Sequence, residues 1–452
     1  MLHLSGDALS CGGLRTVRNG RALEGAEAGM WLLDKLLTRV VKQGELIIVD
    51  HDGKEYRYGA PIAGKSPVKV RLNDKSAVNH IVRYPQVGAA EVYMDGRMDV
   101  IEGDIRDLIL LVHSNAPAGS GEEALKPKGL LRKVTETALA KADSINWKSK
   151  SRRNAEHTYN MTRRLYELFL DEDRQYTCAY YLDPKDSLEK AQLDKKAHLA
   201  AKLHLKPGMR VLDIGCGWGG LGLYLHRHYD VDVLGIALAP DQIAFSKERA
   251  EAAGVADRVK FELMDYRDVE GPFDRIVSVG LIEHLGQPHY PGFFEKTRQL
   301  LADDGVMVSH CCGRMGMPGT TDKFTRKYIF PGGYIPALSE LVTEAEKNAL
   351  IVSDVEAVRY HYALTLEEWY KRTVAAREEI IELYDERFYR MWQFYLAGAE
   401  SSFIHGSLVN WQLQYVKRRD AVPMVRDYLF EEEVRLRALE EPPEWHLAQA
   451  AE

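Results

Sequence analysis

The chain has 452 residues, which is long enough for two or three domains with substantial hydrophobic cores. Its apolar and charged fractions, 45% and 28%, are those of a soluble globular protein, and its net charge of −7 argues against a general nucleic-acid binder. Five cysteines without a regular spacing indicate a reducing compartment rather than a disulfide scaffold. No stretch approaches the roughly 20 apolar residues that span a bilayer, and the N-terminus lacks an apolar signal segment. We therefore expect a cytoplasmic protein.

The N-terminal part predicts a small α+β domain over residues 29–115, preceded by a flexible arm over 1–28. Apolar residues from Trp31 to Val41 fall at helical spacing, with Lys35 and Arg39 among them. We expect this helix to pack on the first domain; a role at a membrane surface is the alternative. Short strands are predicted at 46–49, 55–58, 68–72 and 91–100.

A linker and basic segment follows over residues 116–150. Its first part is rich in Ala, Gly, Ser and Pro, and from Lys126 to Arg164 basic residues far outnumber acidic ones. Such a stretch can contact anionic lipid headgroups, or it can form one solvated face of a helix.

After Leu205-Lys-Pro-Gly208 the chain alternates between strand and helix patterns, which predicts an α/β fold with a doubly wound parallel sheet for the domain expected over residues 151–420. In such a sheet, ligands bind at the carboxyl ends of the strands. Aromatic-rich helices after residue 340 predict a C-terminal helical cap, and residues 421–452 are expected to form an acidic tail. The strands are predicted at Arg210–Ile214, Asp232–Leu238, Val259–Leu263, Asp274–Val279 and Val306–His310.

A glycine loop, Gly215-x-Gly217-x-Gly219, follows the first of these strands. Glycines at this spacing let the backbone turn tightly and approach a nucleotide-type cofactor. Dinucleotide-binding proteins place a carboxylate about 20 residues onward, but the strand ending at Leu238 lacks one, and Asp213 precedes the glycines instead. No Gly-Lys-Ser/Thr follows, which excludes a P-loop. The pattern favours S-adenosylmethionine (SAM) over NAD; a glycine turn without a ligand is the alternative.

Other polar residues also follow predicted strands. Glu283 and His284 come after 276–280, and His310 ends the strand that begins at Val306. Each could be structural, but their convergence on one sheet edge favours a site. Asp265 and Tyr266 follow 259–264, where an adenine ring could stack on the tyrosine and donate its amino group to the carboxylate.

Two cysteine motifs suggest other chemistry. His310-Cys311-Cys312 could ligate a metal, but adjacent strand residues point to opposite faces and no spaced second pair exists, so we expect no metal site. Cys178 could be a nucleophile. Since no sequence feature indicates a lowered pKa, a buried, inert thiol is the default.

An ordered set of motifs resembles the cyclopropane fatty-acid synthases, which are SAM-dependent enzymes. The resemblance spans roughly residues 150–420, and a weaker one at Tyr93-Met-Asp-Gly96 suggests the family's N-terminal lipid-binding domain. The motifs are Asn154-Ala-Glu-His157, Tyr176-Thr-Cys-Ala-Tyr180, Asp213–Gly220, Asp265-Tyr-Arg-Asp268, Asp274–Gly280, Glu283-His284, Lys327-Tyr-Ile-Phe-Pro331 and Thr365-Leu-x-x-Trp-Tyr370.

The resemblance implies two sets of site residues. Gln242 would contact the cofactor ribose, which accounts for the missing carboxylate, and Cys312 would contact a bound bicarbonate through its backbone. Glu283 would be useful beside an anion only if it is protonated or orients His310. The SAM site would comprise Tyr176, Thr177, Asp213, Gly215, Gly217, Leu238, Gln242, Asp265 and Tyr266; the bicarbonate site would comprise Cys178, Glu283, His310, Cys312 and Tyr362.

The resemblance also implies the reaction. The cis double bond of an unsaturated phospholipid acyl chain would take the SAM methyl group, and bicarbonate would deprotonate the carbocation to close a cyclopropane. The protein would be a homodimer, peripherally associated with the inner membrane, without a nucleic-acid partner. Aromatic side chains would shield the cation, although each could equally be ordinary core; the candidates are Tyr362, Trp369, Tyr370, Trp392, Phe394 and Tyr395.

The chain departs from the family pattern near the cofactor and the base. It carries Tyr181 where members often have Trp, Ala237 where they have Thr, and Cys311-Cys312 where they have Thr-Ile. Methyl transfer is still expected, but methyl-branched or methylene products stay open. Two further hypotheses are a methyltransferase for a soluble small molecule and a non-catalytic lipid-binding protein.

Overall fold

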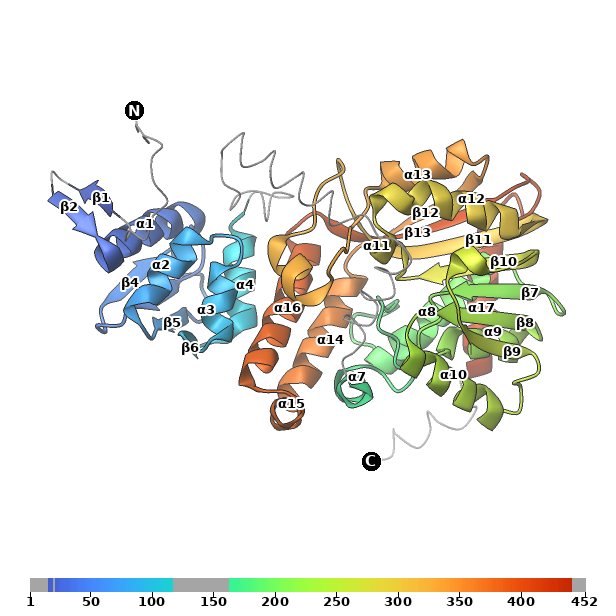
Figure 1. The fold of residues 1–452 in the computed structure, drawn as a ribbon, viewed down its shortest axis with the longest axis horizontal. Helices are drawn as coiled ribbons and strands as arrows, with labels where there is room; N and C mark the ends of the chain where they lie inside the picture. Colours follow the sequence, from blue (N-terminus) through green and yellow to red (C-terminus); the bar gives the residue numbers. More distant parts are fainter. Residues whose placement is uncertain (1–14, 19–20, 117–161, 441–452) are drawn as a thin grey trace. The chain divides into compact units, whose positions relative to one another are not determined.

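The computed structural model describes residues 15–18, 21–116 and 162–440, which form two compact units (Figure 1). The N-terminal unit comprises Met1–Lys126 and Tyr384–Ser401, and the large unit comprises the rest of the chain. Nearly all of the expected linker and basic segment, and the motif at 154–157, lie outside the described residues. Within the described part, every helix is too short or too polar to cross a membrane.

The N-terminal unit is built on a four-stranded sheet with the order β4-β3-β5-β6. Its central strands β3 and β5 are parallel, and both outer strands run antiparallel to their neighbours. The strands are β3 (Leu46–Val49), β4 (Glu55–Tyr58), β5 (Val68–Leu72) and β6 (Met98–Glu102), and a separate hairpin consists of β1 (Arg15–Arg18) and β2 (Arg21–Glu24). The helices are α1 (Gly25–Val40), α2 (Lys75–Arg83), α3 (Gly88–Met94), α4 (Ile105–Ser114) and most of α16 (Glu386–Ile404).

Two predictions for this unit are wrong, whereas its first three strands are confirmed. The expected strand at 91–100 is helical up to Met94, and β6 begins only at Met98. Every residue of α3 except Ala89 is buried, so its apolar pattern did not separate helix from strand. The expected flexible arm contains β1, β2 and the start of α1. Asn19-Gly20, a hairpin sequence, lies between these two strands.

The large unit contains a seven-stranded sheet with the order β12-β13-β11-β10-β7-β8-β9. Strands β7 to β11 are parallel, and β13 runs antiparallel to both β11 and β12. The predicted fold class and all five predicted strands are confirmed. The order reverses between β7 and β10, which makes their carboxyl ends the crevice of a doubly wound sheet. The strands are β7 (Arg210–Ile214), β8 (Asp232–Ala237), β9 (Val259–Leu263), β10 (Phe273–Val279), β11 (Leu301–Arg314), β12 (Ile351–Val358) and β13 (Leu408–Val416).

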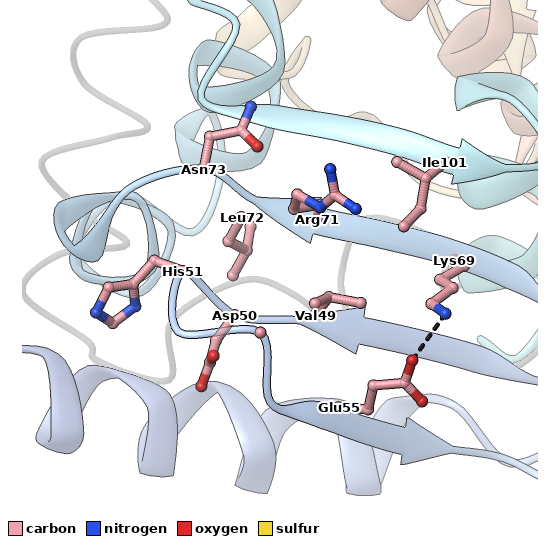
Figure 2. Close-up of a pocket in the computed structure, with 10 residues that line it drawn as sticks. Val49, Asp50, His51, Glu55, Lys69, Arg71, Leu72, Asn73 and Ile101 are labelled. Atoms are coloured by element: carbon pink, nitrogen blue, oxygen red, sulfur yellow. Dashed lines mark ion pairs between the residues drawn. The ribbon is translucent and has the colours of Figure 1, made fainter.

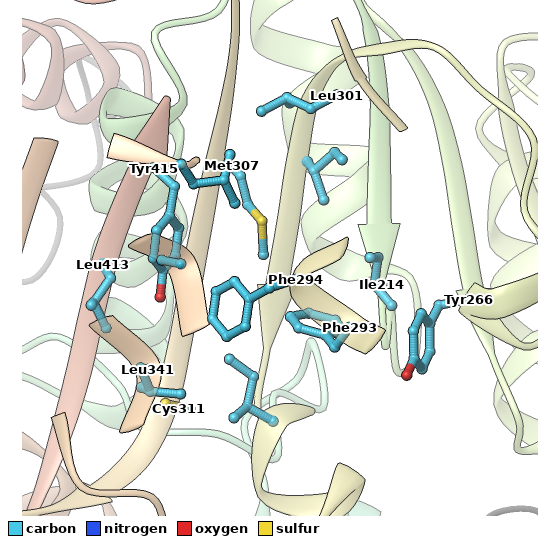
Figure 3. Packing of buried hydrophobic residues seen from close by; sticks show 14 of the residues in the cluster. Ile214, Tyr266, Phe293, Phe294, Leu301, Met307, Cys311, Leu341, Leu413 and Tyr415 are labelled. Carbon is cyan, nitrogen blue, oxygen red and sulfur yellow. The ribbon is translucent and has the colours of Figure 1, made fainter. Parts of the chain in front are cut away.

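Hydrophobic cores lie on both faces of this sheet, because alternate strand residues point to opposite sides. Leu212 and Ile276 belong to one cluster, which also contains Met307 (Figure 3), whereas their neighbours Val211 and Val277 belong to the other. The helices that belong wholly to the large unit are α7 (Arg163–Phe169), α8 (Leu188–Leu203), α9 (Gly220–Tyr229), α10 (Pro240–Ala252), α11 (Ile282–Leu285), α12 (Tyr290–Leu300), α13 (Leu338–Lys347), α14 (His361–Ala375), α15 (Arg377–Leu383) and α17 (Asp427–Glu440).

The C-terminal part differs from the expected acidic tail. Helix α17 packs against α8: Leu436 is fully buried in the core, and Glu433 Oε1 lies 2.7 Å from His198 Nδ1. An apolar face therefore makes this acidic stretch part of the folded unit. Of the aromatic candidates for shielding a cation, Trp392, Phe394 and Tyr395 belong to the N-terminal unit. Tyr362, Trp369 and Tyr370 lie on α14 of the large unit.

Candidate cofactor and active site

The glycine loop connects β7 to α9 at the point where the strand order reverses. Gly215, Gly217 and Gly219 have φ angles of +87°, +54° and +82°, in the left-handed region that favours glycine. A Cβ at Gly219 would lie 2.8 Å from Phe261 Cζ, whereas one at Gly217 would meet nothing within 4 Å. The turn is therefore packed on one side and open at Gly217, as close approach of a ligand requires.

Asp213, the acidic residue before the loop, lies on β7 and is 1% exposed. Its Oδ2 atom has no hydrogen-bond partner among the described residues. Burial raises the pKa of Asp213 to about 7, and the charge of Lys195 acts in the opposite direction. A buried carboxylate with an unused oxygen beside an open glycine turn fits a ligand that donates hydrogen bonds.

Tyr176 and Thr177 lie in the segment before α8. The Tyr176 ring packs among Trp369, Tyr166 and Phe169, with ring centroids 5.1 to 5.9 Å apart. A Cβ at Gly280, which follows β10, would lie 2.8 Å from Thr177 Cγ2. The segment thus reaches the carboxyl end of β10, next to the glycine loop.

Leu238 and Gln242 lie at the junction of β8 and α10. Leu238 is half-buried and Gln242 is 6% exposed. The Ser246 hydroxyl donates to the Gln242 carbonyl at 2.7 Å and lies 3.3 Å from the Gly217 carbonyl. The first turn of α10 is therefore held against the glycine loop.

Asp265 and Tyr266 follow β9. The Asp265 carboxylate accepts two hydrogen bonds from the Arg267 guanidinium, at 2.7 and 2.6 Å, and one from the Arg267 backbone. Tyr266 is buried edge-to-face against Phe293, with centroids 5.4 Å apart (Figure 3). Most of this ring therefore belongs to the core.

Glu283 lies on α11, where the chain leaves β10. Its Oε1 atom accepts a hydrogen bond from the Cys312 backbone N–H, and its buried Oε2 atom has no partner among the described residues. Burial raises the pKa of Glu283 to about 7, although hydrogen bonds to the carboxylate partly oppose this shift. The contact arises because Val279 of β10 pairs with His310 of β11.

His310 is oriented by two amides of β13. Its Nε2 atom lies 3.0 Å from Asn410 Nδ2, and its Nδ1 atom lies 3.0 Å from Gln412 Nε2. Burial lowers the pKa of His310 well below its usual range, so the ring is neutral. A neutral imidazole has one N–H and one bare nitrogen, so one amide presents its oxygen to the ring. Glu283 is not the residue that orients His310.

Asn410 and Gln412 were missed from the sequence, because β13 was not predicted. The signal was present as polar residues that alternate along Asn410-Trp-Gln-Leu-Gln414.

His284, the neighbour of Glu283, packs against Phe330, and burial lowers its pKa to about 4.

Tyr362 lies on α14, and Cys178 lies in a segment that is hydrogen-bonded to this helix. Cys178 is 1% exposed, burial raises the pKa of its thiol, and its Sγ donates to the Ala179 carbonyl at 3.2 Å. This environment argues against a nucleophilic thiolate. The Ala179 N–H donates to Thr365 Oγ1 at 3.0 Å, which ties this segment to α14. The Tyr362 ring on that helix lies 5.8 Å from Trp369 and 4.9 Å from Phe403.

A separate hollow lies in the N-terminal unit (Figure 2). Its volume is about 440 Å³, and its lining includes Asp50, His51, Glu55, Lys69 and Arg71. Lys69 and Glu55 form an ion pair of 2.7 Å across it. None of the site residues expected from the sequence lines this hollow.

The sheet order, the glycine turn at the switch point and the two carboxylate oxygens beside it that have no partner among the described residues are features of a Rossmann-like, SAM-dependent methyltransferase. Coclaurine N-methyltransferase bound to N-methylheliamine and SAH shares this fold, with a TM-score of 0.59 at 18% identity, covering 73% of this chain and 99% of that one. Residues 146–413 match the mycolic acid cyclopropane synthetase family model, and the chain belongs to this family.

Relatives of known name cover most of the chain. The cyclopropane-fatty-acyl-phospholipid synthase of Escherichia coli is 35% identical over 364 residues, covering 79% of this chain and 90% of that protein. The tuberculostearic acid methyltransferase of Mycobacterium tuberculosis is 30% identical, covering 87% and 92%. A mycolic acid cyclopropane synthase complexed with SAH and CTAB is 30% identical with a TM-score of 0.56, covering 58% and 97%. Residues 32–120 match a domain of unknown function.

Proposed function

We propose that this protein transfers a methyl group from SAM to the cis double bond of an unsaturated phospholipid acyl chain and closes a cyclopropane ring. One observation carries the proposal: the buried Oε2 of Glu283, which has no partner in the part of the chain that the structure describes, lies at the same sheet edge as the glycine loop. Methylation of an alkene leaves a carbocation that must lose a proton. It therefore requires a buried, water-free pocket for a base, which methylation of an amine does not.

The cofactor site combines an open backbone with unused polar atoms. Asp213 has a free carboxylate oxygen for a ligand ammonium group, and Gly217 has space for close approach. Gln242 opens the helix that follows the strand end without a carboxylate, and the Ser246 hydroxyl links the Gln242 carbonyl to the loop. The proposed SAM-binding residues are Tyr176, Thr177, Asp213, Gly215, Gly217, Leu238, Gln242, Asp265 and Tyr266.

The chemistry of a second group of residues fits a small anion such as bicarbonate. With a pKa of about 7, Glu283 can carry a proton near neutral pH and donate it in a hydrogen bond. Cys178 is a neutral thiol and His310 a neutral imidazole, so neither repels an anion. The Cys312 N–H, the Cys178 thiol and both ring nitrogens of His310 already have partners, so a protonated Glu283 is the donor that this group offers to an anion. The proposed set is Cys178, Glu283, His310, Cys312 and Tyr362.

When bound, SAM supplies the methyl group and bicarbonate supplies the base. The protein's own contribution is orientation and exclusion of water. Tyr176, Trp369 and Tyr362 form one continuous aromatic wall. Aromatic faces stabilise a desolvated cation by about 1–2 kcal/mol each.

The phospholipid substrate is supported by the name of the relative from Escherichia coli, of which 90% is covered. We infer that the N-terminal unit binds lipid and that the protein works in the cytoplasm, as a homodimer at the inner membrane surface. The resemblance stated above is the basis for this inference. Omitting phospholipid vesicles from the assay should abolish activity if the substrate is a membrane lipid rather than a soluble molecule.

The test is expression in a host that lacks such lipids, followed by mass spectrometry and NMR of the acyl chains. Cyclopropane formation adds one CH2, about 14 Da, and removes the alkene signals. Retained vinylic or exocyclic alkene signals would exclude the cyclopropane. A methyl-branched chain, heavier by about 16 Da, is the second candidate; its two extra hydrogens require a hydride donor such as a reduced nicotinamide or flavin in addition to SAM. The similarity to the tuberculostearic acid methyltransferase and the substituted pair Cys311-Cys312 favour it.

A further inference from the structure

Helix α8 holds the segment Gln175–Thr177 with four hydrogen bonds from two side chains. Gln192 Nε2 donates to the carbonyls of Gln175 and Thr177, at 3.1 and 3.0 Å. Lys195 Nζ donates to Gln175 Oε1 and Thr177 Oγ1, both at 2.8 Å. Residues three apart share a helix face, so Gln192 and Lys195 both hydrogen-bond to Gln175 and Thr177, the residues on either side of Tyr176.

Burial of the Lys195 ammonium group is energetically unfavourable at this position. Lys195 is 1% exposed, and no carboxylate among the described residues lies within ion-pair distance of its Nζ. The carboxylates of Asp171 and Asp213 act on it from further away, and burial lowers its pKa to about 8. Burying an ammonium group without a direct counter-ion costs several kcal/mol. A hydrophobic side chain would avoid this cost but would make neither hydrogen bond to the segment, which points to a role of Lys195 in holding the segment.

The direction of one hydrogen bond suggests that role. An ammonium group only donates, so Thr177 Oγ1 is the acceptor in its contact with Lys195. The Thr177 O–H remains available as a donor, and Thr177 is half-buried, so a ligand can reach it. A hydroxyl donor with a cation behind it is complementary to a carboxylate. Asp213, by contrast, offers its free oxygen to a cationic group.

We propose that Lys195 is a positioning residue of the cofactor site, which fixes Tyr176 and directs the Thr177 hydroxyl toward the carboxylate of the ligand. The site then selects cofactors with an intact amino-acid end. This inference rests on the proposed binding of SAM. Lys195 acts through Thr177 and touches no reacting atom.

The test compares two probes by calorimetry on the full chain: S-adenosylhomocysteine, and 5′-methylthioadenosine, which lacks the amino-acid carboxylate. Lys195→Met should weaken S-adenosylhomocysteine binding about 10- to 100-fold and 5′-methylthioadenosine binding less than about twofold. Lys202→Met is the matched control. Lys202 is also fully buried on α8, but it pairs with Glu356 and does not contact the segment. Its loss should leave the ratio of the two affinities unchanged.

Equal weakening of both probes by Lys195→Met would overturn the proposal, because it would indicate a purely structural role. If the wild-type protein bound neither probe, the proposed function would fail instead. If Lys195→Met does not fold, the same comparison of the two probes is made with Thr177→Val and Lys195→Arg. The valine variant should lose the preference for S-adenosylhomocysteine, and the arginine variant, which keeps charge and donors, should retain most of it. The opposite pattern would contradict the proposal.

Discussion

The backbone N–H of Cys312 occupies one oxygen of Glu283 and leaves the other buried without a partner among the described residues. The carboxyl group is thereby held on β11 while its second oxygen stays available. The same hydrogen bond uses the N–H that the family resemblance assigned to the anion. Burial raises the pKa of Glu283 to about 7, so a proton on the second oxygen can replace that donor.

Glu283→Gln should lower turnover on lipid by about 10²- to 10⁴-fold and leave S-adenosylhomocysteine affinity unchanged. The amide keeps an acceptor for Cys312 and a donor for the anion, but unlike a carboxyl group with a pKa of about 7 it cannot exchange a proton with that anion. Unchanged lipid modification in this variant would show that the site assignment is wrong.

The same variant should be more stable than the wild type at pH 8. Because the folded pKa of Glu283 lies above its usual value of 4.5, its carboxyl group favours folding at low pH. This contribution is lost as pH rises through about 7. Glutamine does not lose it, so urea denaturation should show a gain of about 1–3 kcal/mol at pH 8 and almost none at pH 4.5. A gain of equal size at both pH values would contradict this explanation.

The affinity for S-adenosylhomocysteine should be highest between pH 7 and 8. Below this range Asp213, with its pKa of about 7, becomes protonated and no longer attracts an ammonium group. Above it Lys195, with a pKa of about 8, loses its charge. Asp213→Asn should abolish the fall on the acidic side and leave the basic side intact. Calorimetry at half-unit pH intervals measures both.

Gly219→Ala should mainly lower the stability of the fold, whereas Gly217→Ala should mainly weaken cofactor binding. At Gly219 the added methyl group lies 2.8 Å from Phe261 and 2.9 Å from Ser246, so urea denaturation should show a loss of about 1–3 kcal/mol or more. At Gly217 the space is empty and only the φ angle of +54° opposes the change, at about 1 kcal/mol. Its main effect should be weaker cofactor binding. Comparable losses of stability in both variants would contradict the conclusion that the loop is open at Gly217.

Gln412→Leu should reduce turnover about 10- to 100-fold without changing cofactor affinity, because His310 loses the partner of its Nδ1 atom. Gln414→Leu is the control on the same face of β13, since Gln414 Nε2 donates to the Lys202 carbonyl and to Tyr428. It should change stability and not turnover. Equal effects of both variants on turnover would argue against specific orientation of His310.

The sequence predicted the parallel part of the sheet because its strands are apolar runs separated by turns. It failed at β13, where Asn410, Gln412 and Gln414 are buried with amide groups that contact His310 and Lys202. The alternation of polar and apolar residues along β13 is typical of a strand with one solvated face, whereas its amide-bearing face is buried as well. For the same reason the candidate site was found at the strand ends, whereas Gln192 and Lys195 were missed. Their helix contains charged residues that are typical of a solvated face, yet most of it is buried.

Helix α17 lies outside the region that matches the family but belongs to the folded unit. The family match ends at residue 413, but the folded unit continues to Glu440. A protein shortened at that boundary would uncover the apolar surface beneath Leu429 and Leu436 and leave Lys202 and His198 of α8 open to water. Exposed patches of this kind drive self-association. The edge of the matched region and the edge of the stable unit are therefore different places in this chain.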